Sequence, residues 1–401
     1  MPAVSCAVVS ESQDDAAPEG SERRPAEQDA AAEPSNRARG DKRDREQGGS
    51  EARKLSRRGW TVLLSAILVL VFVLLGMFVR VPYVVLGPGP TYNTIGEVDG
   101  AKVIKVDGRE TYPTKGELRM TTVSFSDEVT LFGALGMWIS GRYALAPREA
   151  YFEEGQTDKE FRQHSQKLFR RSQSKAELAA FHHLGYPTKV LIGRVMPNTP
   201  AASQAAGQLA KGEQLVAVNG KEIGSIKDVH EALASTEPGQ TIPVTVLSED
   251  GSEKREISIT LGRRAGSKPP EPLIGVTLAE RAAVPFTVDV TLDEVGGPSA
   301  GMMFALGIID RLTPGALTGG KAVAGTGTIE RTGEVGPIGG ISFKLVAARE
   351  AGAQAFLVPA KNCAAAAATA PEGLRLIKVD NLGDAVSALK NLAAGRPTPT
   401  C

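Results

Sequence analysis

The chain has 401 residues, and its 46 Lys and Arg residues balance its 46 Asp and Glu residues. A chain of this length has room for two or three domains. It carries no basic excess to neutralise phosphates, so nucleic acid is not expected to be a partner. The three cysteines, Cys6, Cys363 and Cys401, lack C-x-x-C spacing, so neither a metal site nor a cofactor is expected. Cys363 and Cys401 could pair in an oxidising compartment, but isolated thiols are the simpler interpretation.

Residues 1–58 are rich in Ala, Glu, Asp, Arg, Ser and Gly and contain almost no large apolar residue. Such a segment cannot bury enough apolar surface to offset its conformational entropy, so we expect a disordered tail.

Residues 59–80 have the properties of a transmembrane helix. No charged residue occurs from Thr61 to Val79, a length close to the hydrocarbon thickness of a bilayer. A signal peptide would lie at the N-terminus and end in small residues, and neither is true here. Basic residues crowd the N-terminal flank, whereas Arg80 stands nearly alone on the other side. The positive-inside rule therefore predicts a cytoplasmic tail and an extracytoplasmic remainder.

Residues 81–186 are expected to form an extracytoplasmic connector or the first part of a later domain. The stretch 83–93, YVVLGPGPTYN, looks like a Gly/Pro-rich connector, and 116–125, GELRMTTVSF, alternates as a strand. A helix is predicted from about Asp158 to His183, ending near Gly185. It carries three of the four histidines, His164, His182 and His183. They have no evident carboxylate or thiol cluster beside them, so we interpret them as surface residues rather than metal ligands.

Residues 187–263 resemble a PDZ domain, most specifically in the stretch KGEQLVAVNGKEI, followed by the strands TIPVTVLSED and EKREISITL. PDZ domains bind peptide C-termini beside an open strand edge. The usual glycine-rich carboxylate-binding loop is not obvious, since YPTKVLIG matches it poorly. Peptide binding is therefore an open question. The stretch after this domain, GRRAGSKPPEP, is rich in Gly, Pro and charged residues and is predicted to be a linker.

Ser299 lies in EVGGPSAG, directly before the apolar run MMFALGII. It is either the N-cap of a buried helix or a nucleophile beside the positive end of that helix. A capping box would need Glu or Gln where Met302 stands. A serine nucleophile needs a base, and no histidine follows His230. Lys344, in ISFKLVAARE, lies on the apolar side of a predicted helix, where burial would favour its neutral form.

GGPSAG and TGEVGPIGGISFKLVAAREAGAQAFLVP together resemble the proteolytic domain of Lon-type serine proteases. The resemblance implies that Ser299 is the nucleophile, that Lys344 is the general base and that Thr326 supports the site. Many Lon proteases have an acidic residue where this chain has Gly296. Residues 158–183 are similar to the long helix of that domain, which would make the PDZ unit an insertion within it.

The whole arrangement resembles the bacterial membrane proteins that combine PDZ and Lon-like domains. The expected fold class is therefore α+β, with one transmembrane helix, a β-barrel-like PDZ domain with two helices, and a Lon-type α/β proteolytic domain over residues 271–395. Residues 315–322, GALTGGKA, match a P-loop except for Ala322, where Ser or Thr is required. Nucleotide binding is therefore not expected there.

Two functional hypotheses follow. The first is a single-pass, extracytoplasmic and ATP-independent serine endopeptidase of the cell membrane, which cleaves proteins or peptides with a Ser-Lys dyad and uses the PDZ domain for recruitment or gating. The alternative is a non-catalytic PDZ and Lon-like scaffold that binds partners at the membrane. Whether the chain forms a homo-oligomer stays open.

Overall fold

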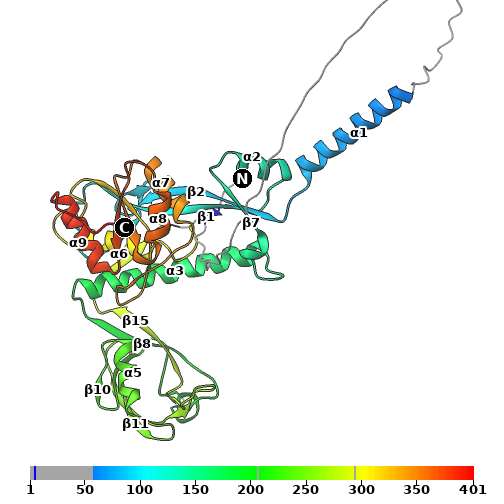
Figure 1. Ribbon diagram of the computed structural model, residues 1–401. Coiled ribbons are helices and arrows are strands. Elements are labelled where there is room, and N and C mark those ends of the chain that lie inside the picture. Colours follow the sequence, from blue (N-terminus) through cyan, green and yellow to red (C-terminus); the bar gives the residue numbers. More distant parts are fainter. Residues whose placement is uncertain (1–3, 6–56, 206, 293–294) are drawn as a thin grey trace, which may run out of the picture.

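The computed structural model describes residues 4–5, 57–205, 207–292 and 295–401. It contains a long apolar helix that projects from a mixed α/β body, and a smaller β-rich unit attached below the body (Figure 1). The predicted tail, residues 1–58, lies outside the described residues except for Val4–Ser5 and the first two residues of the projecting helix.

The projecting helix, α1, spans Arg57–Phe78. Its 22 residues, at about 1.5 Å per residue, give a length of about 33 Å, close to the hydrocarbon thickness of a bilayer. By length and composition it can cross a membrane. Gly76 is its only buried residue, so nearly the whole apolar surface faces outward.

The body is built on a mixed sheet with the strand order β21-β20-β17-β6-β2-β7. Strand β17 pairs in parallel with both β6 and β20, whereas β6, β2 and β7 pair antiparallel. A two-residue strand, β1, Val4–Ser5, adds to β6. The other strands of this sheet are β2, Tyr83–Asn93; β6, Glu117–Ser126; β7, Ala144–Pro147; β17, Ala322–Gly325; β20, Ala355–Pro359; and β21, Arg375–Val379.

The expectation of a connector at residues 83–93 is wrong, because this stretch is β2, a strand inside the sheet. Its prolines suggested a break. They are accommodated because the pairing of β2 with β6 shifts register between Pro88 and Thr91. An irregularity of this kind is where proline is tolerated in a sheet. The strand predicted over 116–125 is confirmed as β6.

Helices cover both faces of the sheet. On one face, α3, α6 and α9 bury the side chains of Leu118, Met120, Leu357 and Ile377. On the other, α7 and α8 pack against alternate strand residues such as Phe356 and Val358. The helix predicted for 158–183 is confirmed. The five helices are α3, Asp158–His183; α6, Gly301–Leu312; α7, Ile341–Glu350; α8, Cys363–Thr369; and α9, Leu382–Ala393.

The smaller unit follows α3 and has its own hydrophobic core. Its sheet has the order β12-β11-β9-β8-β15, with β10 paired to β9. Its elements are β8, Thr188–Val195; α4, Pro200–Gln204; β9, Gln214–Val218; β10, Lys221–Glu222; α5, Ile226–Ala234; β11, Thr241–Leu247; β12, Lys254–Thr260; and β15, Val276–Ala282.

Strand β15 pairs with β8 along its whole length and forms one edge of this sheet. The sheet therefore continues past residue 263, where the sequence had suggested a linker, and includes residues that we had grouped with the C-terminal region. The linker segment 262–272 is itself a small hairpin, in which Gly262–Arg263 (β13) pairs with Pro272–Leu273 (β14). Hydrophobic periodicity could not assign β15 to either sheet, because its partner strand, β8, is remote in sequence.

Short elements complete the described chain. They are β3, Glu97–Val98; β4, Ala101–Lys102; β5, Ile104–Asp107; α2, Leu131–Ile139; η1, Arg148–Ala150; β16, Thr287–Val290; β18, Thr328–Ile329; β19, Val335–Gly336; and η2, Ala360–Asn362.

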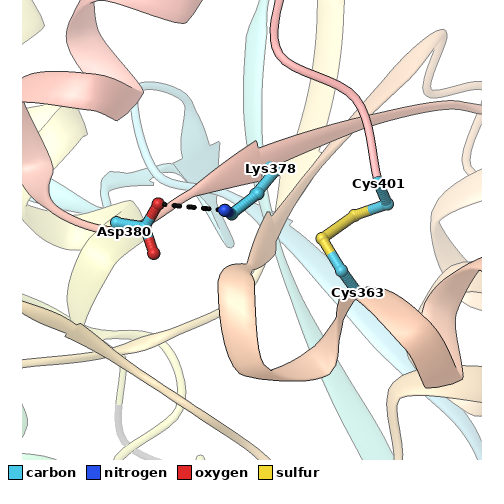
Figure 2. The surroundings of a disulfide bond; sticks show 4 residues. All are labelled: Cys363, Lys378, Asp380 and Cys401. Carbon is cyan, nitrogen blue, oxygen red and sulfur yellow. Dashed lines mark ion pairs between the residues drawn. A yellow bond between two sulfur atoms is a disulfide. The ribbon is translucent and has the colours of Figure 1, made fainter.

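A disulfide bond joins Cys363, at the start of α8, to Cys401 (Figure 2). The isolated-thiol interpretation is therefore wrong. The bond holds the C-terminal segment beside β21, where the Lys378 amide donates to the Pro399 carbonyl. Closing a loop of 38 residues restricts the unfolded chain and stabilises the fold by roughly 2–4 kcal/mol. Spacing alone did not reveal the pairing, because the fold of the intervening residues brings the two ends together.

Candidate active site

Ser299 lies in the turn that leads into α6, and only 5% of its surface is exposed. The N-cap of α6 is Ala300, and it makes no side-chain capping bond. The interpretation of Ser299 as a helix cap is therefore wrong, and its hydroxyl is committed elsewhere. All twelve residues of α6 are buried, as the apolar run predicted.

Lys344 lies in the first turn of α7 and is completely buried. Its Nζ lies 2.6 Å from Ser299 Oγ. The helix reaches this position because Gly340, its N-cap, adopts a left-handed conformation with φ of 67°, which a residue with a side chain rarely takes. Lys344 lies on the apolar side of α7, and this side packs against the sheet, so the lysine is buried there.

Thr326, which follows β17, joins the serine and the lysine. Lys344 Nζ donates to Thr326 Oγ1 over 2.9 Å, and this hydroxyl donates to the Ser299 carbonyl over 3.0 Å. Lys344 Nζ also donates to the backbone carbonyl of Thr121 in β6, over 3.2 Å. The structure thus brings together all three residues predicted from sequence. Thr121 was not predicted as a site residue, because it contributes only its backbone carbonyl, which any residue type has.

The turn around Ser299 is fixed by main-chain bonds. The Gly327 amide donates to the Ser299 carbonyl over 2.8 Å, and the Met302 amide donates to the Gly327 carbonyl over 3.1 Å. A Cβ at Gly301 would lie 2.7 Å from both Ser172 Oγ and an Ile329 methyl carbon, so a larger residue there would displace α6. The N-terminal end of α6, with its positive partial charge, therefore stays beside Ser299.

A cleft of about 710 Å³ opens next to this turn. One wall is α3, another is the edge strand β15, and the third is β18 with the residues after it. Pro298, which precedes Ser299, lies in the lining, and its carbonyl accepts a bond of 2.9 Å from Ser172 Oγ. The cleft therefore connects the edge of the smaller sheet with the turn that carries Ser299.

His182, at the end of α3, contacts both β15 and the segment after β18 beside the cleft. Its Nε2 lies 3.1 Å from Glu280 Oε1 of β15, and its Nδ1 lies 2.9 Å from the Arg331 carbonyl. The Glu280 carboxylate raises the pKa of His182 above its ordinary 6.5. Burial opposes ionisation of Glu280, but bonds from His182 and from the Ile226 amide outweigh it and lower its pKa. Burial instead lowers the pKa of the neighbouring His183.

The sequence GALTGGKA lies in the turns before β17, not after a strand as a phosphate loop would. Lys321 Nζ donates to the Leu392 carbonyl at the end of α9, over 2.8 Å. This lysine therefore has a structural role at a helix C-terminus, where a positive charge is favourable.

Comparison with known proteins agrees with this architecture. Residues 293–390 match the family described as "Lon protease (S16) C-terminal proteolytic domain", and residues 191–247 match the PDZ domain family. The chain is 28% identical over 155 residues to Lon protease 2 of Bacillus subtilis (strain 168), a match that covers 37% of this chain and 27% of that protein. It is 38% identical over 99 residues to Lon protease of Campylobacter concisus (strain 13826), covering 24% of this chain and 12% of that protein.

Solved PDZ domains are also similar. The PDZ domain of the SdrC-like protein of Listeria innocua is 26% identical and covers 22% of this chain and 92% of its own, with a TM-score of 0.19. The match over residues 293–390 places the C-terminal region among Lon-type proteolytic domains by sequence similarity. The chain as a whole joins this domain to a PDZ domain and to one apolar helix that is long enough to span a membrane. It matches about a quarter or less of the length of the Lon proteases named above.

The His182–Glu280 pair predicts a pH-dependent contribution to stability. Because the pKa of His182 is raised in the folded protein, its contribution to stability is complete below pH 6.5. This contribution is lost as pH rises through the folded-state pKa. Because the pKa of Glu280 is lowered, its contribution to stability is complete above pH 4.5. It is lost as pH falls through the folded-state pKa. His182→Gln should therefore lower the melting temperature most near pH 6 and least near pH 9. Because the His182 side chain is 33% exposed to solvent, we expect only roughly 0.5 kcal/mol, or about 1–2 °C.

His183→Gln is the matched control for this measurement. Because the pKa of His183 is lowered, the native protein loses stability as pH falls, and the substitution should remove that loss. At low pH, His183→Gln should therefore raise the melting temperature, whereas His182→Gln should lower it. A His182→Gln deficit that is equal at pH 6 and pH 9 would show that the ion pair does not contribute.

Proposed function

We propose that this protein is a membrane-anchored serine endopeptidase in which Ser299 is the nucleophile and Lys344 the general base. The observation that carries the proposal is the 2.6 Å separation of Lys344 Nζ and Ser299 Oγ inside a Lon-type proteolytic domain. A nucleophile and base within hydrogen-bonding distance are the signature of covalent catalysis. Complete burial of Lys344 supports the role of base, because removal of water disfavours the charged form of an amine.

The contacts of Lys344 suggest how the proton moves. In the neutral amine, two N–H groups can donate to Thr326 Oγ1 and the Thr121 carbonyl, which directs the lone pair at Ser299. As Ser299 Oγ attacks the scissile carbonyl carbon, its proton passes to Nζ. The ammonium then protonates the leaving amine as the C–N bond breaks, and the acyl-enzyme forms. A water molecule then attacks the ester carbon while Nζ takes its proton. Nζ returns this proton to Ser299 Oγ as the ester C–O bond breaks, which releases the acid and restores both residues.

The helix α6 supports the same chemistry. The tetrahedral intermediate carries a negative oxygen, which positive helix ends and backbone amides stabilise. Ser299 stands immediately before the cap of α6, so an oxyanion formed on its substrate would lie near this end. Thr326 serves as a positioning residue, since it holds both the Ser299 carbonyl and the lysine.

The dyad is tested with the full chain in detergent and an unfolded protein such as reduced, alkylated α-lactalbumin. Ser299→Ala and Lys344→Met should each lower kcat by about three orders of magnitude or more, because nucleophile and base act as a unit. Thr326→Val should lower kcat by about ten-fold. Lys361→Met, at an exposed lysine of the same domain, is the control and should retain full activity.

Two outcomes of this assay would change the proposal. Full activity of Lys344→Met would remove the base assignment, and full activity of Ser299→Ala would leave the scaffold function as the better hypothesis. We also propose that cleavage is independent of ATP, since Lys321 is bonded to the end of α9. A several-fold stimulation by hydrolysable ATP would contradict this part.

We propose further that substrates reach Ser299 along the edge of β15. An extended polypeptide can add to an exposed sheet edge through main-chain hydrogen bonds. Here that edge is also a wall of the cleft that ends at Pro298, so recruitment and cleavage would use one continuous surface. Lys175, on the α3 wall, forms an ion pair of 2.6 Å with Glu330 and keeps the opposite walls together.

Obstruction of the cleft tests this path. Ala279 lines the cleft from β15, so Ala279→Trp should reduce kcat/KM for the unfolded protein by about ten-fold or more, while cleavage of a short fluorogenic peptide changes little. Ser258→Trp, at an exposed position of the opposite edge strand β12, is the matched control and should change neither. Unchanged protein cleavage by Ala279→Trp would exclude this path. Increased peptide cleavage would indicate that the PDZ domain gates the site.

We also propose that the tail is cytoplasmic and the remainder extracytoplasmic. The basic flank of α1 and the Cys363–Cys401 disulfide support this orientation, because disulfides persist in oxidising compartments. The pairing of β1 with β6 points the other way, since it would put residues 4–5 beside the body. Two paired residues gain little against the entropy of closing so long a loop, so we give the charge pattern more weight.

Cysteine labelling in intact cells tests the orientation. Cys6 is the only cysteine outside the disulfide, so a membrane-impermeant maleimide should label the protein only after permeabilisation. Ser252→Cys, at an exposed turn of the PDZ domain, should be labelled without permeabilisation. Labelling of Cys6 in intact cells, or recovery of Cys363 and Cys401 as thiols, would reverse the assignment.

A further inference from the structure

Helix α2 presents an apolar face to the outside. Its nine residues, LFGALGMWI, carry no charge. Five large side chains are between 42% and 70% exposed: Leu131, Phe132, Leu135, Trp138 and Ile139. At about 100° per residue these positions form one continuous stripe along the helix. A soluble protein rarely exposes such a contiguous apolar surface unless it binds something.

The inner side of α2 accounts for its attachment to the body. Ala134 is buried, and Met137 packs with it against Val85 and Val129. Thr130 caps the helix by accepting a bond from the Gly133 amide. The fold therefore does not require the outer face to be apolar, and a polar helix surface would serve the core equally well.

The other exposed large apolar residues indicate what covers this face. In the part of the chain that the structure describes, they lie on α1 or directly after it, at Val79 and Tyr83, with Tyr112 as the one exception. The stripe on α2 thus extends the apolar surface of the candidate membrane span. The two helices also lie in contact at the foot of α1 (Figure 1).

The depth of α2 is fixed by three contacts with the end of α1. The Phe132 ring lies so close to Gly76 that a Cβ there would be 2.5 Å from it. Gly76 is two residues from the end of α1, or about 3 Å along its axis. Beyond the helix, Arg80 forms a bridge with Thr130, and the Val81 amide donates to the Val129 carbonyl over 3.0 Å. The α2 helix is therefore held at the level of the last turn of α1.

We propose that α2 is an interfacial helix whose outer face enters the lipid leaflet in which α1 ends. Apolar side chains of such helices insert to the boundary between headgroups and acyl chains, where a tryptophan is especially favourable. The charged neighbours suit this position, since Arg80 pairs with Glu128 before α2 and Arg142 pairs with Glu350 after it. The helix would hold the protease body at a set orientation against the membrane. The inference rests on the proposed insertion of α1.

The two tryptophans of the chain allow a direct test, because Trp60 lies at the start of α1 and Trp138 on α2. The full chain with Trp60→Phe leaves Trp138 as the sole tryptophan. In phosphatidylcholine–phosphatidylglycerol vesicles, lipids brominated at acyl carbons 6 and 7 should quench its fluorescence by about half or more, and bromine at carbons 11 and 12 should quench less. The Trp138→Phe variant reports on Trp60 and should also be quenched, which verifies insertion of α1.

Each other outcome overturns the proposal. Quenching of Trp60 without quenching of Trp138 would show that α2 stays outside the lipid while α1 is inserted. Blue-shifted but unquenched Trp138 emission would show that protein, such as a second copy of the chain, covers the face. If neither tryptophan were quenched, α1 would not span the bilayer, and the basis of the inference would fail with it. None of these readouts depends on proteolytic activity.

Discussion

The contact between Lys344 and Ser299 is the constraint on which the architecture of the body depends. A completely buried lysine is expensive unless polar partners surround it, and the partners come from distant parts of the chain. Thr121 lies on β6, Thr326 follows β17, and Ser299 precedes α6. The parallel pairing of β6 with β17 is what brings these segments together. The N-terminal strands are therefore part of the site rather than a spacer before it.

The position of the PDZ domain has a physical consequence for access to this site. Because its sheet begins directly after α3 and ends with β15, both its entry and its exit are held against the protease body. The ion pair of His182 with Glu280 and that of Lys175 with Glu330 join the walls around the cleft. An ATPase motor is one way to deliver a polypeptide to a buried serine. In the path proposed above, the edge of β15 would instead lead a polypeptide into the cleft through main-chain hydrogen bonds alone.

The contact between α1 and α2 bears on the proposed attachment of the protein to a membrane. One helix is enough to tether a domain but leaves it free to rotate, whereas a second apolar surface at the same depth restricts its orientation. The packing of Phe132 on Gly76 makes α1 and α2 a single unit at that level. In Figure 1 the rest of the body continues along the strands away from α1, and the PDZ domain lies below α3. The cleft next to Pro298 would consequently face a defined direction relative to the bilayer.

The sequence by itself determined the features that depend on local pattern. They include the apolar span at α1, the long helix α3 and the buried helix after Ser299, because periodicity and composition act over neighbouring residues. It also pointed to Ser299 and Lys344 through two family motifs, and to Thr326 through the stretch AGTGTIE. Only the tertiary structure decided that 83–93 is an internal strand of the sheet, that β15 belongs to the PDZ sheet, that Cys363 meets Cys401, and that Thr121 contacts the lysine. Each of these depends on a partner remote in the chain, and no local property of the sequence specifies such a partner.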